Sequence, residues 1–266
     1  MIILHELFTE VECMDLLTTV ILTKNEEKNI IDVVCNCKQL TSNVLIVDSG
    51  STDKTVELAK QNGAKVVNRE WDNDFSAQRN FALEHVDTDW VLYLDADERL
   101  DEMLISEIKV VLESGAPAMY RFIRQNSAFG RDFKYGVLGP DSVTRLFPKD
   151  KVRWQDKVHE RPVGDLPVVT LKGYLKHYTY RSFEQYVQKM NQYSSIGAQN
   201  YHDKHKKVSI LGDFILRPFF AFFKMYIIKR GFLEGWLGFV LCLNYTNYTL
   251  NKYVKLKLLN KEKENA

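Results

Sequence analysis

The chain has 266 residues, of which 45% are hydrophobic and 27% are charged. This composition excludes a disordered chain, and the length suffices for one good-sized α/β domain with an appendage. The formal net charge is +1, but residues 204–266 hold 12 Lys and Arg against 4 Asp and Glu, so the rest of the chain is acidic. A basic end on an acidic body favours contact with something anionic, either a membrane surface or a nucleic acid.

The cysteines and the N-terminus predict the compartment. The four cysteines have the spacing of neither a zinc site nor a disulfide framework, which favours a reducing, cytoplasmic location. Residues 1–17 are interpreted as an N-terminal extension, and we expect no secretory signal there because Glu6, Glu10 and Glu12 interrupt the apolar run.

From residue 18 onward, strand and helix patterns alternate. The apolar runs at 18–23, 44–50, 64–68 and 90–97 predict strands, and 24–40, 51–63 and 75–86 predict helices, the last with Phe75 among its apolar residues. This alternation is typical of a Rossmann-like, mostly parallel sheet with crossover helices. Ligands gather at the carboxyl ends of such strands, so residues 23–26, 48–53 and 95–97 matter most.

The second half of the chain reads differently. A helix is predicted to end at Gly115, residues 119–180 predict short strands and turns, and Ser182 with Gln185 forms a capping box that opens another helix. The longest uncharged stretch of the tail, 235–251, contains three Asn and two Thr and makes a poor membrane-spanning helix. Its mixture of aromatic, aliphatic and basic residues favours a C-terminal amphipathic helix pair lying in a membrane interface, with an ordinary packed helical subdomain as the alternative.

The string "WVLYLDADERL" places two carboxylates after a buried strand. Asp95 and Asp97 share one face of an extended chain and repel each other, which predicts a bound Mg²⁺ or Mn²⁺ between them. The alternative is that Asp95 caps the next helix. Glu98, together with Asp97, is interpreted as a residue that favours the start of that helix.

The string "VDSGSTDKT" predicts a tight turn at Gly50 followed by a capped helix, with Ser51, Thr52 or Asp53 as the cap. Asp48 has the acceptor oxygens to bind a uracil N–H or ribose hydroxyls. The sequence contains neither a P-loop nor a G-x-G-x-x-G string, which argues against triphosphate hydrolysis and dinucleotide redox chemistry.

Together, "TVILTKNEEKNI", "LIVDSGSTDKT" and "LYLDADE" resemble the family 2 glycosyltransferases of the GT-A fold over residues 18–180. The strings "FSAQRNFAL", "WQDKVHERP" and "LKHYTYRS" and the tail resemble the lipopolysaccharide-core β-1,4-glucosyltransferase branch. This resemblance implies a UDP-sugar donor, Mg²⁺ or Mn²⁺, and inversion by direct displacement. The implied nucleotide-sugar contacts are Thr23, Asn25, Glu26, Asp48, Ser49, Asp53, Arg79 and Asp95, and the implied metal ligands are Asp97 and Asp95.

Two positions depart from the family pattern. Many relatives carry a second acid where this chain has Ser49, and the downstream E-D pair that serves as the base is absent. The expected base is Glu160, with His159 and Asp156 as the other candidates. His177 is expected either to reach the metal or diphosphate or to be structural.

The predicted domains are the extension 1–17, a catalytic domain 18–203 and a membrane-associated helical extension 204–266. The expected activity is transfer of glucose or a related hexose from UDP to a lipopolysaccharide-core or other lipid-linked glycan, at the inner face of a bacterial cell membrane. The alternatives are a non-catalytic membrane-bound scaffold with the same fold and a sugar nucleotidyltransferase, the second disfavoured because "TKNEEKN" lacks glycine. No nucleic-acid partner is expected.

Overall fold

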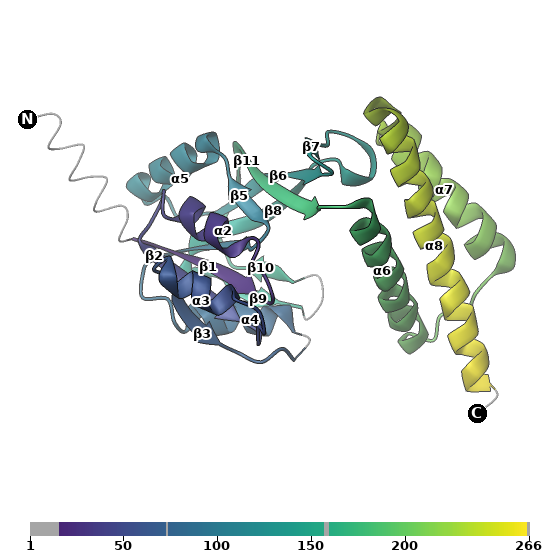
Figure 1. Ribbon diagram of the computed structural model, residues 1–266, viewed down its shortest axis with the longest axis horizontal. Helices are drawn as coiled ribbons and strands as arrows, with labels where there is room; N and C mark the ends of the chain where they lie inside the picture. Colours follow the sequence, from purple (N-terminus) through teal and green to yellow (C-terminus); the bar gives the residue numbers. More distant parts are fainter. Residues whose placement is uncertain (1–15, 73, 157–159, 265–266) are drawn as a thin grey trace, which may run out of the picture. The chain divides into compact units, whose positions relative to one another are not determined.

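The computed structural model of the chain describes residues 16–72, 74–156 and 160–264 (Figure 1). The chain divides into two compact units, one made of the segments up to residue 124 and from 141 to 177, the other of 125–140 and the segment from 178 onward. The predicted boundary at residue 203 differs from this division, since the preceding helix belongs with the C-terminal helices.

The first half of the first unit follows the predicted alternation. Its elements are β1 (Leu17–Thr23), α2 (Ile30–Cys37), β2 (Asn43–Asp48), α3 (Thr55–Gln61), β3 (Lys65–Asn68), α4 (Phe75–Leu83) and β4 (Trp90–Asp95). The four strands are parallel in the order β3-β2-β1-β4. The register pairs Thr23 with Asp48 and Leu22 with Asp95, so the polar residues that end these strands share one edge of the sheet.

The second half turns the sheet into a mixed one. It contains β5 (Glu98–Leu100), α5 (Glu102–Ser114), β6 (Met119–Ala128), β8 (Asp141–Pro148), β9 (Arg153–Gln155), β10 (Arg161–Val163) and β11 (Val168–Tyr180). β8 pairs antiparallel with β4, and the sheet continues through β6, β11 and β5. The α/β class is confirmed, but the sheet is less parallel than predicted, because strands after residue 119 lack the crossover helices that parallel neighbours require.

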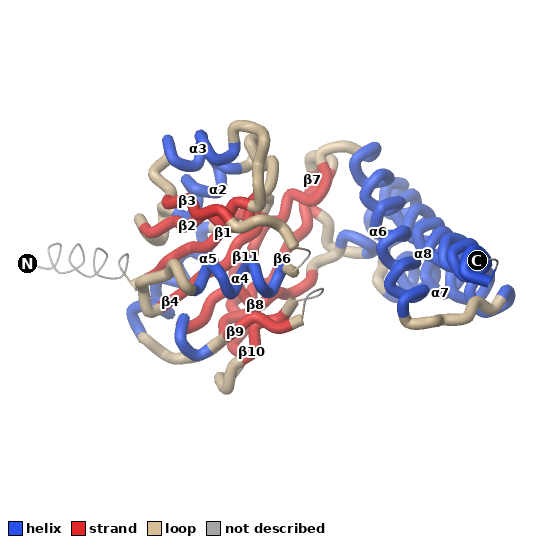
Figure 2. The backbone as a smooth tube through the Cα atoms, turned by 90° about the horizontal axis from the view of Figure 1, so that it is seen from below, coloured by secondary structure: helices blue, strands red, loops and turns tan. Residues whose placement is uncertain are grey.

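The strands of this unit form a central sheet flanked by helices (Figure 2). Its core lies on both faces of the sheet. Neighbouring residues of β4 point to opposite faces, so Leu92 packs with α2 and α5 while Tyr93 packs with α4. Burying each such side chain contributes about 1.5–3 kcal/mol. The two packed layers therefore fix the strand ends that carry the polar loops.

The second unit is mainly helical. It contains β7 (Arg131–Asp132), α6 (Phe183–Asp203), α7 (Arg217–Phe223), α8 (Gly235–Glu264), the π-helical segments Ile210–Leu216 and Lys224–Ile228, and the 3₁₀ turns Gly136–Leu138 and Gly231–Glu234. Among the described residues, no helix has the length and apolar character needed to cross a bilayer.

Helix α6 starts where the capping box predicted. The Ser182 hydroxyl accepts a hydrogen bond from the Gln185 backbone N–H at 3.1 Å, and the Gln185 side chain accepts one from the Arg181 backbone N–H at 2.9 Å. The helix packs along α8, where Lys255 donates to the Ser194 hydroxyl at 2.7 Å. This packing is the physical reason that α6 joins the C-terminal unit.

Candidate active site

Asp48 ends β2 and stabilises the turn that follows it. Its buried carboxylate accepts hydrogen bonds from the Thr23 hydroxyl at 3.1 Å, the Gly50 backbone N–H at 2.9 Å and the Ser51 backbone N–H at 2.8 Å. Gly50 has a φ of 85°, the left-handed conformation that the predicted turn requires. The geometry thus gives Asp48 a role in loop architecture, and its contact with a nucleotide base stays a prediction.

Asn25 and Asp53 join the loop after β1 to the loop after β2. The Asn25 side chain accepts from the Thr52 backbone N–H at 2.8 Å, and Asp53 accepts from the Glu27 backbone N–H at 3.2 Å. Asp53 also accepts from the Thr55 backbone N–H at 3.0 Å. Both side chains therefore hold two strand-end loops in one arrangement, and their predicted contact with a nucleotide is untested.

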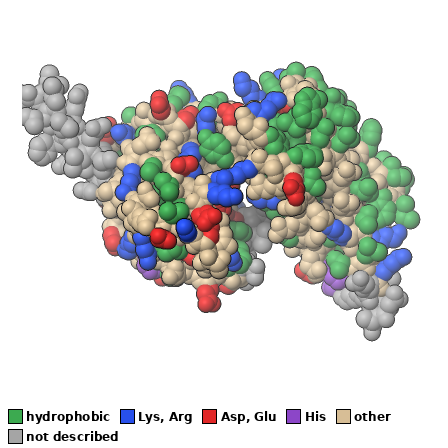
Figure 3. All heavy atoms as spheres, in the orientation of Figure 1, with side chains coloured by type: hydrophobic (Ala, Val, Ile, Leu, Met, Phe, Trp, Pro, Cys, Tyr) green, Lys and Arg blue, Asp and Glu red, His purple; other side chains and the backbone are tan. Residues whose placement is uncertain are grey.

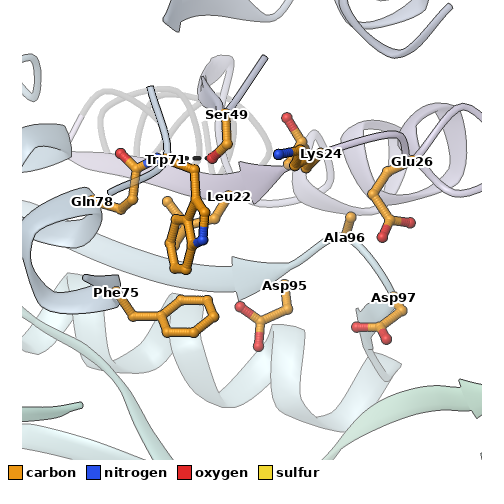
Figure 4. A pocket seen from close by; sticks show the side chains of 11 residues that line it. Leu22, Lys24, Glu26, Ser49, Trp71, Phe75, Gln78, Asp95, Ala96 and Asp97 are labelled. Carbon is orange, nitrogen blue, oxygen red and sulfur yellow. Dashed lines mark hydrogen bonds between the residues drawn. The ribbon is translucent and has the colours of Figure 1, made fainter. Parts of the chain in front are cut away.

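A cavity of about 340 Å³ opens at this edge of the sheet (Figure 4). It is lined by Leu22, Thr23, Lys24, Glu26, Ser49, Trp71, Phe75, Gln78, Asp95, Ala96 and Asp97. Five predicted site residues are brought together here, namely Thr23, Glu26, Ser49, Asp95 and Asp97. The lining does not include Asn25, Asp48, Asp53 or Arg79.

Two aromatic residues in this wall were not predicted as site residues. Trp71 and Phe75 meet edge to face with ring centroids 4.5 Å apart. Phe75 was predicted to lie on the apolar side of α4, yet it is 42% exposed because it begins the helix and points into the cavity (Figure 4). The sequence did contain a signal for these two site residues, because Trp71 and Phe75 lie four residues apart on either side of Asp74, the N-cap of α4.

Gln78 places a polar group in the same wall. Its side chain is 1% exposed, and its amide N–H group donates to the Ser49 hydroxyl at 2.8 Å and to the Arg69 backbone carbonyl at 3.0 Å. Among the described residues, its amide oxygen has no hydrogen-bond partner. A buried, unsatisfied acceptor costs about 1–3 kcal/mol, so a ligand N–H that met it would bind more tightly.

Asp95 is held between two buried arginines. The guanidinium of Arg79 donates to one carboxylate oxygen at 3.0 Å, and that of Arg145 donates to the other at 2.7 Å. Burial alone would raise the pKa of Asp95, but the charges of Arg145 and Arg79 outweigh it and hold the pKa below its ordinary value. Because these two arginines already compensate the charge of Asp95, repulsion between Asp95 and Asp97 does not by itself require a cation. The predicted metal at the two aspartates stays a prediction.

Arg79, which was predicted to contact the nucleotide-sugar, contacts two carboxylates of the chain itself. Its side chain is 2% exposed and shares its donors between Asp95 and Glu160. Its guanidinium also lies 4.7 Å from the centroid of the Trp154 ring. Arg79 thus positions two carboxylates, and its contact with a nucleotide-sugar stays a prediction.

Glu98 belongs to this network rather than to a helix start, which corrects the prediction. It lies in β5, is fully buried, accepts from the Asp95 backbone N–H at 2.9 Å and lies 3.3 Å from both Arg145 and Arg124. Asp101 caps helix α5 instead, accepting from the Leu104 backbone N–H at 2.7 Å. The sequence could not reveal this, because Arg124 and Arg145 come from strands far along the chain.

Asp97 lies in the turn after β4, and its side chain is partly exposed. A carboxylate oxygen lies 3.4 Å from the Nε2 atom of His177, which β11 contributes. Within the described ranges, no three His, Cys, Asp or Glu side chains cluster closely enough to hold a metal. One carboxylate and one imidazole fit a divalent cation only if substrate oxygens and water complete its coordination, as Mg²⁺ sites commonly do. Asp97 with His177 is one arrangement that could contribute to such a site, and the predicted metal ligands Asp97 and Asp95 stay a prediction.

The three predicted bases have different surroundings. Glu160 lies 3.3 Å from Arg79 through one carboxylate oxygen, and its other oxygen has no hydrogen-bond partner among the described residues. Asp156 is half-exposed and pairs with Arg161 at 3.0 Å. His159 lies outside the described residues. Of the two candidates that the structure describes, Glu160 is the one linked to Asp95, and the link runs through Arg79.

The model of the family described as Glycosyl transferase family 2 matches residues 18–158, more than half of the chain. The chain belongs to this family. This family 2 glycosyltransferase has the α/β GT-A fold that the sequence predicted, with a mixed sheet, flanking helices and a helical C-terminal region. The matched residues contain the three strand ends that line the cavity.

The family 2 assignment agrees with full-length relatives. An uncharacterized glycosyltransferase of Rickettsia prowazekii (strain Madrid E) is 32% identical over 95% of this chain and 90% of its own length. Another, from Rickettsia conorii (strain ATCC VR-613 / Malish 7), is 33% identical over 83% of this chain and 82% of its own. Both matches cover a larger share of the chain than the family model does.

Solved structures were also found. TarS 1-349 of S. aureus in complex with UDP-GlcNAc is 13% identical, over 94% of this chain and 91% of that one, with a TM-score of 0.45. Glucosyl-3-phosphoglycerate synthase of Mycobacterium tuberculosis, in complex with Mn²⁺, UDP-glucose and phosphoglyceric acid, is 21% identical over 45% of this chain and 46% of that one, with a TM-score of 0.34.

Proposed function

We propose that this family 2 glycosyltransferase transfers a hexose, glucose or a relative of it, from a UDP-sugar with inversion at the anomeric carbon. The observation that carries the proposal is the cavity at the strand ends, where Asp97 and His177 lie 3.4 Å apart beside the arginine-held Asp95. The nucleoside would occupy the part lined by Thr23, Ser49 and Trp71. The ribose and diphosphate would extend toward Asp95 and Asp97.

Asp97 and His177 would hold Mg²⁺ or Mn²⁺ together with the diphosphate. When bound, such a cation stabilises the negative charge that develops on the departing UDP. Asp95 has a separate task, because both of its oxygens are already engaged by guanidinium groups. It would orient the donor through a hydroxyl that donates to the remaining lone pairs of its carboxylate.

Glu160 would act as the base. In the transfer, an acceptor hydroxyl oxygen forms a bond to the anomeric carbon, the bond from that carbon to the UDP oxygen breaks, and the hydroxyl proton passes to a carboxylate. Arg79 anchors one oxygen of Glu160, which leaves the second oxygen for the proton. Arg79 would then position both Asp95, on the donor side of the reaction, and Glu160, on the acceptor side.

We predict that Glu160→Gln lowers kcat about 10²–10⁴-fold, the usual contribution of a positioned base, with little change in donor KM. Asp156→Asn is the matched control, since its half-exposed side chain pairs only with the exposed Arg161. Initial rates of sugar transfer measure both variants. If Glu160→Gln retains the wild-type kcat, Glu160 is not the base. A loss of kcat in Asp156→Asn would then point to Asp156 as the base.

The acceptor would be a lipopolysaccharide-core or other lipid-linked glycan, reached by peripheral contact with the cytoplasmic face of the cell membrane. Large apolar side chains are exposed along one stretch of the helical unit, which we call the apolar face (Figure 3): Ile210, Leu211, Ile215, Leu216, Phe219, Phe220, Phe223, Ile227, Ile228, Phe232, Leu233, Trp236, Phe239 and Leu243. Patches of this kind mark protein or membrane contacts.

The charges along the apolar face favour an anionic bilayer. Lys224, Lys229 and Arg230 are exposed, whereas the two acids of the same stretch, Asp213 and Glu234, are buried. Each buried acid is paired with an arginine. Among the described residues of this stretch, the exposed charged side chains are therefore basic, as in helices that lie in the interface of anionic membranes.

A panel of nucleotide-sugars tests the proposed activity. The purified protein is incubated with each donor and Mg²⁺ or Mn²⁺, with and without a lipopolysaccharide-core acceptor, and UDP release and glycan mass are measured. We expect metal-dependent UDP release from one UDP-hexose and a mass increase of one hexose on the acceptor. Formation of UTP and sugar-1-phosphate from a UDP-sugar after inorganic pyrophosphate is added would indicate a nucleotidyltransferase, and the absence of turnover with every donor would indicate a scaffold.

A further inference from the structure

The helical unit contains a second pocket, of about 820 Å³, that the transfer reaction does not use. Its walls are Phe129, Arg131, Arg181, Ser182, Phe183, Trp236, Leu237 and Val240. Most of these side chains are apolar or aromatic, and the two arginines supply the charge. Trp236 is 77% exposed and also belongs to the apolar face, so the pocket adjoins the surface proposed to contact the membrane.

The aromatic wall is built at a conformational cost. Ala128 pairs with Arg131 in a two-residue hairpin, which places Phe129 at a φ of 54°, where an aromatic residue is rarely found. Such a conformation costs about 1–2 kcal/mol. Contacts between Phe129 and the rings of Phe183 and Tyr186, with centroids 6.3 Å and 6.4 Å apart, offset the cost and fix the ring in the pocket wall.

The charges around this pocket select an anion. Arg131 and Arg181 are both exposed residues, and both line the pocket. The acid nearest to Arg131 is Glu234, which is buried and also accepts from the backbone N–H groups of Lys134 and Tyr135 at 2.8 and 2.9 Å. Glu234 therefore anchors Arg131 without placing a negative charge in the pocket.

We propose that this pocket binds an anionic membrane phospholipid, the phosphate at Arg131 and Arg181 and an acyl chain against Phe129, Phe183 and Trp236. Arginine recognises phosphate with paired N–H donors, and the apolar walls match a hydrocarbon chain. An acidic peptide would satisfy the arginines but not the apolar walls. The inference rests on the proposed membrane contact, because the bilayer supplies the ligand.

Binding is tested with the full chain and monomeric dihexanoyl phosphatidic acid, in the absence of any donor sugar. Trp236 is the reporter, since a lipid in the pocket changes the fluorescence of this exposed indole. We expect saturable binding that Arg181→Gln weakens about fivefold, the typical effect of one basic residue on an anionic lipid. Trp236→Ala should weaken it at least about tenfold, as measured by calorimetry.

Lys224→Gln is the matched control, because it removes one exposed charge from the apolar face outside the pocket. It should leave monomeric lipid binding unchanged. Trp236→Phe should keep binding by calorimetry and lose the fluorescence change. Arg131 is not substituted, because its removal would leave the buried Glu234 carboxylate without its arginine partner and destabilise the fold.

Four results would overturn the proposal. The first is that Arg181→Gln and Lys224→Gln weaken binding of dihexanoyl phosphatidic acid equally, and the second is that inorganic phosphate competes as strongly as the lipid itself. The third is equal affinity for zwitterionic dihexanoyl phosphatidylcholine, and the fourth is self-association of the chain through Trp236 that excludes the lipid. Failure of the proposed membrane contact would give a different result: no variant would bind vesicles of equal parts phosphatidylcholine and phosphatidylglycerol. UDP-sugar hydrolysis is expected to remain at the wild-type rate in Arg181→Gln.

Discussion

Asp95 illustrates how one side chain acquires its role from distant partners. Arg79 comes from α4 and Arg145 from β8, and both guanidinium groups are nearly inaccessible to solvent. Burial alone would lower the pKa of Arg145, but the carboxylates of Asp95, Glu98 and Glu160 raise it above its ordinary value. The network is thus a set of mutually compensating buried charges, and removal of one member leaves another uncompensated.

Asp95→Asn should lower the free energy of unfolding by about 2–3 kcal/mol at neutral pH, the value of a lost charge-assisted hydrogen bond. Because the folded-state pKa of Asp95 is depressed, its contribution is fully present above the unfolded-state pKa of about 3.9. The contribution is lost as the pH falls below that value. Denaturant unfolding of both proteins between pH 7 and pH 3 checks this prediction, and a difference that is constant over that range would contradict it.

Sequence reasoning reached part of the site at the residue scale. Thr23, Glu26, Ser49 and Asp97 were predicted and line the cavity, because a residue's position after a parallel strand determines its place at the sheet edge. The arginine partners of Asp95 and the place of Glu98 in this network were not predicted, since these arginines lie 16 to 50 residues away from the acids that they bind. Sequence spacing carries no information about such pairings.

At the scale of elements, the close packing of β11 against α5 controls the position of His177. Gly173 in β11 approaches α5 so closely that an added Cβ atom would lie 2.3 Å from the Leu104 backbone nitrogen. From Leu175, two residues after Gly173, β11 pairs with β5, and the register places His177 opposite Glu98. A strand displaced at Gly173 would therefore move the imidazole away from Asp97.

Gly173→Ala should destabilise the fold by about 3 kcal/mol, because the methyl group overpacks a backbone contact that has no flexible neighbour to yield. Gly115→Ala is the control. Its φ of 60° strains an alanine by about 1 kcal/mol, but nothing lies within 4 Å of the added atom. Thermal unfolding compares the two, and an equal loss in both variants would contradict the packing account.

The elements up to residue 100 were more predictable than those after it. Alternating apolar runs and helical periodicity located β1 to β4 and the helices between them, because each run is buried locally. The pairing of β8 with β4 and the assignment of α6 to the helical unit depend on contacts between distant segments. Periodicity cannot supply these contacts.

At the scale of the whole molecule, the two units have separate cores and separate proposed ligands. The first contains the cavity at the strand ends, and the second contains the apolar face and the lipid pocket. Three crossings of the chain, near residues 124, 140 and 177, connect them. Each unit should therefore respond to its own ligand.

Hydrogen exchange of the full chain should separate these responses. UDP with Mn²⁺ should protect backbone amides in 23–27, 48–53 and 95–97, because a bound nucleotide restrains the loops at the strand ends. Vesicles containing phosphatidylglycerol should protect 210–243 instead. Protection of 210–243 by UDP alone, or of the strand-end loops by vesicles alone, would contradict this division of binding between the units.

Asp97 is proposed to make sugar transfer depend on a divalent metal. The most direct measurement is UDP release from the preferred UDP-sugar, with and without the acceptor, during titration of Mn²⁺ into the wild-type chain, Asp97→Asn and the exposed control Asp32→Asn. We predict that Asp97→Asn lowers kcat/KM about 10²–10³-fold at saturating metal while the fold is retained, and that Asp32→Asn matches the wild type. Full, metal-dependent activity in Asp97→Asn would contradict the account.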